Sequence, residues 1–411
     1  MCITTRTEPV NNYMYCDTAG EFGYRLRGRV PIRRDAHKDD AGTWVPVPGF
    51  ISDHEWERLI PPNEMPSVRN PENGYAVTCN QKITTDDYPY IISQHYGSDL
   101  RAQRITARIE QVPLGAMTVE EMASIHKERV SISAKHVIKV VSAIDSAGLS
   151  AAAAILQELL LNWDGDMQPE LPAPTAFAAV TEALTNATVP KIFGLQLGDA
   201  ILGGGRGGPT HWSTLKTALI KEAAEEPEGN GHMASYVLGD GVASWTDLYT
   251  DALEVGGKAL IDRLGTYEDN KEAWAWGEVH TTSPSHPLSR YFPDAASLLD
   301  PPAVPMGGGF DTPQAASFGN WGRRGYSVGG LSVNRYIHDP SDWSKSRWIA
   351  PLGASGHPGS PHYSDQALLY SAVDTIPQLW AWDDVLAASE TTQVLEPAEV
   401  FAKPVLASAK M

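Results

Sequence analysis

Residues 73–105 read NGYAVTCNQKITTDDYPYIISQHYGSDLRAQRI, a stretch that joins an aromatic strand pattern, a lone amide and the start of a helix. The alternation after Gly74 predicts a β-strand that leads to Asn80. A helical pattern begins at Arg101. The stretch therefore contains both a side-chain amide, Asn80, and a guanidinium, Arg101.

Composition indicates a large globular protein. The chain has 411 residues, 42% of them apolar, which is enough for a substantial core and for two or three domains. The formal charge of -18 argues against a nucleic-acid backbone or an anionic membrane as the main partner. No segment reaches the roughly 18 to 20 consecutive apolar residues of a membrane helix, and the first residues lack the apolar region of a secretory signal. The compartment stays open.

The order of patterns along the chain predicts an α+β fold. Residues 12–24 predict a β-hairpin, so sheet structure begins almost at once. A capping box at Thr118 and Glu121 opens a series of helical patterns, and strand patterns return from Trp274. We expect two strand sets that share one sheet system around a helical insertion. The predicted parts are 1–115 (first strand-rich part), 116–272 (helical insertion), 273–375 (second strand-rich part) and 376–411 (tail).

Two groups of residues have a possible reading as ligand sites. The run GGGRGG at 203–208 lacks the Lys and Ser or Thr that complete a phosphate loop, so a flexible connection is predicted. The spacing of four histidines matches no zinc motif, and polar loop residues are predicted instead. These histidines are His280, His286, His357 and His362.

The cysteines suggest no site. Cys2, Cys16 and Cys79 are isolated, so neither a disulfide framework nor a cysteine-ligated zinc is indicated. Removal of Met1 would expose Cys2, whose own α-amino group could act as its base. The residues after Cys2 lack the apolar pattern of the buried strand that such a nucleophile needs, which argues against this role.

Asn80 and Arg101 each have two readings. A side-chain amide such as that of Asn80 can stabilise the oxyanion of acyl transfer, although a turn residue at a strand end fits the pattern equally well. Arg101 could bind a carboxylate or support polar backbone. Arg104 and Arg108, at helical spacing, are predicted to form a solvated face.

Several runs, spread over most of residues 10 to 370, resemble the penicillin acylase family of N-terminal nucleophile amidohydrolases, which includes cephalosporin and acyl-homoserine lactone acylases. They occur in the family's order: NNYMYCDTAGEFGYRLRGRVPIR, VPVPGF, NPENGYAVTCNQ, DDYPYIISQHYGSDLRAQRI, LLLNWDG, HPLS and SRWIAPLGASGHPGSPHYSDQ.

The resemblance implies an αββα sandwich, here partial, that carries a helical insertion. It implies hydrolysis of an amide between an acyl group and an amine, in antibiotic or acyl-homoserine lactone type substrates, without a cofactor. In this family the β chain begins with a serine that attacks the carbonyl, with its own α-amino group as base. The family's oxyanion asparagine falls on Asn80, and the arginine of its Tyr-Gly-x-x-x-Arg run falls on Arg101.

The resemblance also implies missing partners. The α chain, the linker, the serine and the first part of the β chain have no counterpart here, so we expect a C-terminal fragment that is inactive by itself. Ile92 stands where a calcium-ligating acid would be, and no metal is expected. The alternative is a non-catalytic binding or structural remnant of the fold. Acyl specificity stays open, and family members are often periplasmic or secreted.

Overall fold

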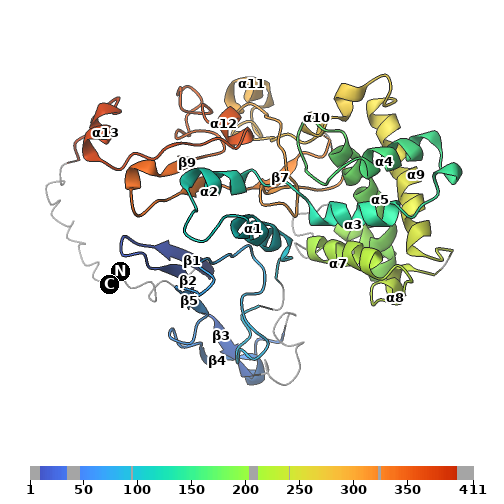
Figure 1. Cartoon of the computed structure of the whole chain (residues 1–411), viewed down its shortest axis with the longest axis horizontal. Helices are drawn as coiled ribbons and strands as arrows, with labels where there is room; N and C mark the ends of the chain where they lie inside the picture. The colour runs from blue at the N-terminus through green and yellow to red at the C-terminus, as the bar shows by residue number, and fades with distance from the viewer. Residues whose placement is uncertain are drawn as a thin grey trace, which may run out of the picture.

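The computed structural model describes residues 10–34, 47–93, 96–202, 212–239, 241–322 and 325–395. The run at 203–208 and Cys2 lie outside these residues. Figure 1 shows one strand region at the bottom of the view, a helical bundle at the right and a second strand region along the top. Helices α1 (Leu100–Glu110) and α2 (Val119–His126) lie between these three regions.

The predicted hairpin is confirmed. Strand β1 (Asn11–Cys16) pairs antiparallel with β2 (Phe22–Arg27). The side chain of Asp17 accepts hydrogen bonds from the backbone of Ala19 and Glu21, which closes the turn between the strands.

Three further short strands complete the first region. β5 (Ser67–Arg69) extends the β1–β2 sheet, and β3 (Pro31–Arg33) pairs with β4 (Trp56–Leu59) after the 3₁₀ turn η4 (Ser52–His54). A small core lies under these strands, formed by Leu26, Val30, Ile32, Ile60 and Met65.

A helical bundle follows the first strand region. Its helices are α3 (Ile132–Val141), α4 (Ala151–Leu161), α5 (Ala173–Phe193), α6 (Leu195–Leu202), α7 (Trp212–Glu225), α8 (Ala234–Val237) and α9 (Trp245–Leu264), with the 3₁₀ turn η5 (Ser146–Gly148). Side-chain oxygens of Thr118, Ser131, Ser150 and Ser244 cap α2, α3, α4 and α9, which satisfies backbone N–H groups of the first turn. Within the described ranges, no helix is long and apolar enough to cross a membrane.

α5 is the central helix of the bundle and is buried along most of its length. α9 packs closely against α4 and α5 because it presents two glycines to them. A Cβ atom at Gly257 would lie 2.8 Å from the backbone of Ala152, and one at Gly256 would lie 3.2 Å from that of Ala179. These three helices, together with α3 and α7, contribute to the largest of the cores among the described residues.

The second strand region begins with helical turns instead of the strands predicted from Trp274. Residues 271–279 form η6 (Lys271–Trp274) and α10 (Trp276–Val279). Both tryptophans are fully buried. The Trp276 backbone N–H donates to Leu171 O, and its indole N–H donates to Gly308 O, so packing against the bundle decides this conformation.

The remaining elements of this region are short. They are η7 (Pro293–Ala295), α11 (Ala296–Leu299), β6 (Ala316–Phe318), β7 (Val328–Leu331), β8 (Arg335–Ile337), η8 (Trp343–Lys345), β9 (Arg347–Ile349), α12 (Ala367–Ser371), β10 (Ile376–Pro377) and α13 (Trp382–Ala387). β10, β9 and β8 form one sheet, and β6 pairs with β7.

The expectation of one shared sheet system is wrong for the described residues. Every sheet there is built from strands of one region only. The two strand regions also have separate cores. They are joined instead through α1 and α2, which makes the contacts of these two helices important for the geometry of the candidate site.

Candidate functional site

Asn80 lies in a turn and not on a strand. Residues 75–78 have no regular structure, and bends follow at 79–81. The backbone of Asn80 has a φ of 71°, in the left-handed region that asparagine tolerates better than most residues. This corrects the strand prediction, and the turn leaves the Asn80 side chain exposed.

Gln81 explains why the strand pattern fails. Its side-chain oxygen accepts a hydrogen bond from the Cys79 backbone N–H at 2.5 Å, and its side-chain nitrogen donates to Val77 O at 3.0 Å. These local bonds occupy backbone groups that a strand would pair with a neighbouring strand. A tight loop results, with Cys79 buried beneath it.

Arg101 joins this loop to the first turn of α1. Its Nη2 donates to Cys79 O at 2.6 Å and to Oδ1 of Asn80 at 2.7 Å. A guanidinium has donors only, so the oxygen of the Asn80 amide must face Arg101. The amide NH₂ group of Asn80 is consequently left to donate elsewhere. The structure therefore brings the two predicted site residues together.

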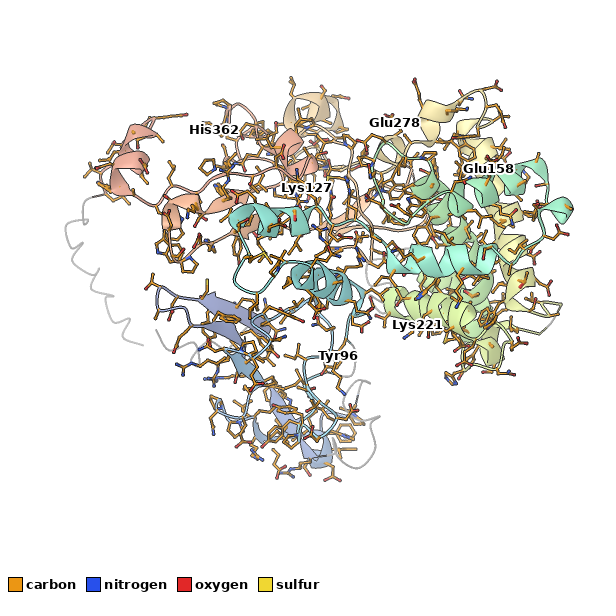
Figure 2. All side chains as sticks on the ribbon, in the orientation of Figure 1. Tyr96, Lys127, Glu158, Lys221, Glu278 and His362 are labelled. Atoms are coloured by element: carbon orange, nitrogen blue, oxygen red, sulfur yellow. The ribbon has the colours of Figure 1, made fainter. Side chains whose placement is uncertain are left out.

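Gly97 allows the chain to pass close to this loop. Its backbone N–H donates to Asn80 O at 2.7 Å, and a Cβ atom at Gly97 would lie 3.2 Å from the Cβ of Asn80. The neighbouring Tyr96 carbonyl accepts a hydrogen bond from Thr214 of α7 at 3.3 Å, which ties the same segment to the bundle. Figure 2 places Tyr96 just below α1.

Cys79 is not suited to be a nucleophile. Burial raises the pKa of its thiol, and the positive charge of Arg101 lowers that pKa by less. The thiol is therefore held in its protonated, less reactive form. Cys79 contributes a backbone carbonyl to the site and packs beneath the loop.

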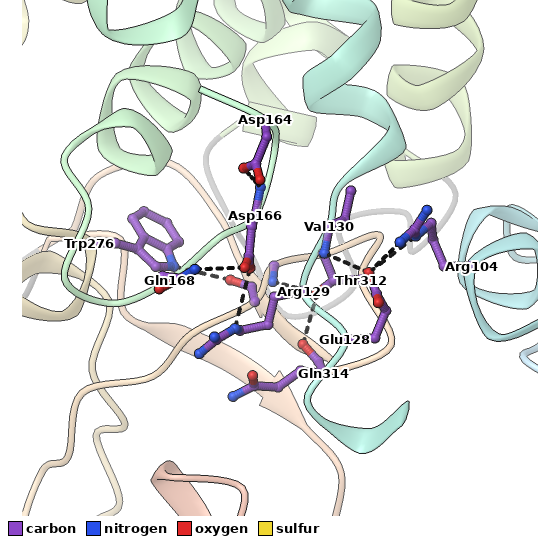
Figure 3. A network of polar contacts seen from close by, with 12 residues as sticks. Arg104, Glu128, Arg129, Val130, Asp164, Asp166, Gln168, Trp276, Thr312 and Gln314 are labelled. Carbon is purple, nitrogen blue, oxygen red and sulfur yellow. Dashed lines mark hydrogen bonds and ion pairs between the residues drawn. The ribbon is translucent and has the colours of Figure 1, made fainter. Parts of the chain in front are cut away.

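Arg104 and Arg108 do not form the solvated face that their spacing suggested. Arg104 donates from Nε and Nη2 to Oε1 of Glu128, at 3.1 and 2.8 Å, and Nε of Arg108 lies 3.6 Å from Oε2. Only 7% of the Glu128 side chain is exposed. Figure 3 shows Arg104 directed at this carboxylate, which lies beside the start of the bundle. Sequence reasoning missed Glu128, because its arginine partners lie on α1, about 20 residues earlier in the chain.

The four candidate histidines have separate surroundings. His280 is fully buried, stacks on Trp276 and bonds Tyr326 O through Nδ1 at 2.7 Å. His286 and His357 accept hydrogen bonds from backbone N–H groups two residues further on. His362 lies between Asp365 and Glu390, which raise its pKa. The described part of the chain contains no group of three or more His, Cys, Asp or Glu residues arranged to hold a metal ion.

A cavity of about 330 Å³ opens at the far end of α1. Apolar side chains of Ile109, Leu114 and Met122 line it, and the hydroxyl of Tyr75 donates to Glu110 at its edge at 2.6 Å. Asn80 and Arg101 are not among the lining residues. The cavity is therefore separate from the Asn80–Arg101 pair.

A solved structure defines the class of fold. The thermostable penicillin G acylase from Alcaligenes faecalis superposes with a TM-score of 0.57 at 19% sequence identity. The match covers 94% of this chain and 68% of the acylase chain. The chain therefore has an α+β fold of the penicillin G acylase type.

Sequence comparisons define the family. The family model for penicillin amidase matches residues 3–387. Penicillin acylase 2 proenzyme of Pseudomonas sp. (strain SE83) is 33% identical over 395 residues, which are 94% of this chain and 46% of that protein. Acyl-homoserine lactone acylase QuiP of Pseudomonas aeruginosa is 24% identical over 392 residues, 86% of this chain and 42% of that protein. The chain belongs to the penicillin amidase family, and it spans less than half the length of these relatives.

Proposed function

We propose that Asn80 and Arg101 form the oxyanion-stabilising part of an amidohydrolase site that cleaves the bond between an acyl group and an amine. Membership of the penicillin amidase family supports this class of reaction. The names of the relatives suggest two substrate classes, acylated β-lactam antibiotics and acyl-homoserine lactones.

The orientation of the Asn80 amide carries the proposal. Arg101 holds Oδ1, so the NH₂ group is the part of the amide that can donate to a substrate. When a nucleophile attacks the scissile carbonyl, the carbonyl oxygen becomes an anion, and a preorganised donor lowers the energy of that state. The positive charge of Arg101 behind the amide polarises it further and favours donation.

We place the attacking group outside these 411 residues. The chain matches only 46% of the proenzyme relative, and the one described thiol beside the pair, that of Cys79, is held protonated. The proposed nucleophile is a serine hydroxyl whose own α-amino group takes up its proton. Its attack forms an acyl-enzyme and releases the amine, and water then releases the acid. The segment that supplies this serine would also supply further strands of an αββα sandwich.

The proposal predicts turnover only with a complementing segment. We would express the chain with the part of the Pseudomonas proenzyme that it does not match, and measure hydrolysis of phenylacetyl and long-acyl chromogenic amides and of acyl-homoserine lactones. The complex should be active and the chain by itself inactive. Asn80→Gly, which retains the left-handed backbone but removes the amide, should lower kcat by about 100-fold or more. Asn162→Ala, an exposed asparagine of the bundle, is the matched control.

The other outcomes decide against the proposal. Turnover by the isolated chain that persists in Cys2→Ala would place the nucleophile inside these residues. Binding of acyl amides without turnover, in a complex that folds and assembles, would favour a non-catalytic remnant of the fold. A value of kcat for Asn80→Gly close to that of Asn162→Ala would remove Asn80 from the reaction.

A further inference from the structure

We infer that Glu128 is a positioning residue that sets the location of the Asn80–Arg101 pair by holding helix α1. The inference rests on the proposed function of that pair, and it adds a residue that lies outside residues 73–105. Glu128 lies in the segment between α2 and α3. Its side-chain hydrogen bonds and ion pairs within the described residues involve neither Asn80 nor Arg101.

One stripe of α1 carries three arginines. Arg101, Arg104 and Arg108 follow one another at intervals of three and four residues, so they lie along the same side of the helix. Arg101 donates a hydrogen bond to Asn80, and the guanidinium groups of the other two arginines both contact the Glu128 carboxylate. A shift or rotation of α1 that breaks the contacts to Glu128 therefore also moves Arg101.

Glu128 is itself fixed by the backbone on both sides. Its carbonyl accepts a hydrogen bond from the Gln314 N–H at 2.9 Å, and one oxygen of its carboxylate accepts the Val130 N–H at 3.1 Å. The next residue, Arg129, accepts a backbone bond from Met167 and pairs with Asp166 at 3.4 Å. Figure 3 shows this anchoring of the segment between the loop that follows α4 and the loop around Thr312.

The burial of Glu128 makes the contact directional. A carboxylate that is 7% exposed loses most of its hydration, so its arginine partners are needed to compensate for that loss. Arg104 donates through both Nε and Nη2 to one carboxylate oxygen, Oε1, and Nε of Arg108 lies 3.6 Å from the other oxygen, so the carboxylate is held by two guanidinium groups of α1. The second strand region is thus linked to the proposed oxyanion site through the Glu128 carboxylate and helix α1.

The first test uses the whole chain and the reactivity of Cys79. Arg101 donates to the Cys79 carbonyl, so displacement of α1 should loosen the loop that buries the thiol. With Cys2 and Cys16 replaced by serine, Glu128→Gln should increase the labelling rate of Cys79 by about tenfold. Glu182→Gln is the matched control, because Glu182 also pairs with an arginine, Arg263, at 2.9 Å and is 11% exposed, but lies in the bundle.

Two outcomes of the Cys79 labelling experiment would contradict the inference. An unchanged rate in Glu128→Gln would overturn the inference. An equal increase in both variants would show a general loss of stability and would overturn it as well.

The second test separates Glu128 from the proposed function. In the complemented enzyme, Glu128→Gln should lower kcat by about 10- to 100-fold with little change in KM. In an Asn80→Gly background the same substitution should have almost no further effect. If the decreases in kcat from Glu128→Gln and Asn80→Gly are additive, the positioning role is refuted and Asn80 remains essential. If Asn80→Gly leaves kcat unchanged, the proposed function itself is refuted.

Discussion

At the scale of single residues, Asn80 satisfies two requirements at once. Its left-handed backbone favours asparagine over branched or bulky residues, and its amide supplies both an acceptor for Arg101 and donors for a ligand. Glycine would meet the first requirement only, and alanine neither. The residue type therefore follows from the turn and from the proposed chemistry together.

His280 provides a residue-scale prediction about stability. Its ring is fully buried, and desolvation lowers its pKa to about 4 from an ordinary value of 6.5. The neutral form is favoured in the folded state, so this stability is fully present above a pH of about 6.5 and is lost as the pH falls towards 4. We expect His280 to contribute up to about 1.4 kcal/mol per pH unit to the decrease in the free energy of unfolding over that window.

Urea unfolding between those pH values checks this expectation. His280→Asn retains a donor for the Tyr326 carbonyl and removes the titrating ring, so the pH dependence should become shallower even if the variant is less stable. His357→Asn, in an exposed loop, is the control. If the free energy of unfolding depends on pH equally steeply in His280→Asn and in the parent protein, His280 is not the source of that dependence.

At the scale of elements, the packing of α9 against α4 is sensitive to side-chain size. Gly257→Ala would bring a methyl group to within 2.8 Å of the α4 backbone, where no flexible side chain can yield. We expect a loss of about 1 to 3 kcal/mol in the free energy of unfolding, because α4 and α9 must separate. Gly148→Ala, whose new Cβ atom would have no neighbour within 4 Å, should change stability by much less. Similar values for the two variants would contradict the close packing.

The sequence predicted some of the helices and strands and missed others. Local signals were sufficient for the β1–β2 hairpin and for α2, because a turn aspartate and a capping box act on their own neighbours. They failed at 75–80, where Gln81 takes the backbone bonds, and at Trp276, where burial against the bundle overrides the strand pattern.

The candidate site was predictable in part. Asn80 and Arg101 came from motifs close together in the chain, and the structure joins them by a hydrogen bond. Glu128 could not be found in this way, since an exposed stripe of arginines and a stripe that pairs with a buried carboxylate have the same spacing. The comparisons confirm the family; the roles of Asn80 and Arg101 stay predictions.

At the scale of the whole molecule, the three separate cores formed by the described residues predict unequal stability. The core of the first strand region contains five buried apolar residues, whereas that of the bundle is several times larger. We expect the region that contains Cys79 to open at lower urea concentration than the helices. Labelling of Cys79 in the background without Cys2 and Cys16, compared with far-UV circular dichroism, measures the two events. Coincident transitions would show one cooperative unit and contradict this expectation.

Because the two strand regions are separate, the position of the Asn80 loop depends on the position of α1. No described sheet crosses from one region to the other, so the geometry of the Asn80 loop depends on Arg101, on the Glu128 contacts and on the segment at Gly97. These contacts are polar and directional, and they leave the Asn80 amide at the surface of the described structure.

The most direct measurement of the central proposal is kcat for Asn80→Asp in the complemented enzyme. Aspartate has the shape of asparagine, tolerates the same backbone and retains an acceptor for Arg101, but it replaces the donating NH₂ group with an oxygen. We predict a decrease in kcat of about 100-fold or more, with the free energy of unfolding nearly unchanged. Activity within about threefold of the parent enzyme would show that the Asn80 amide does not donate to the oxyanion.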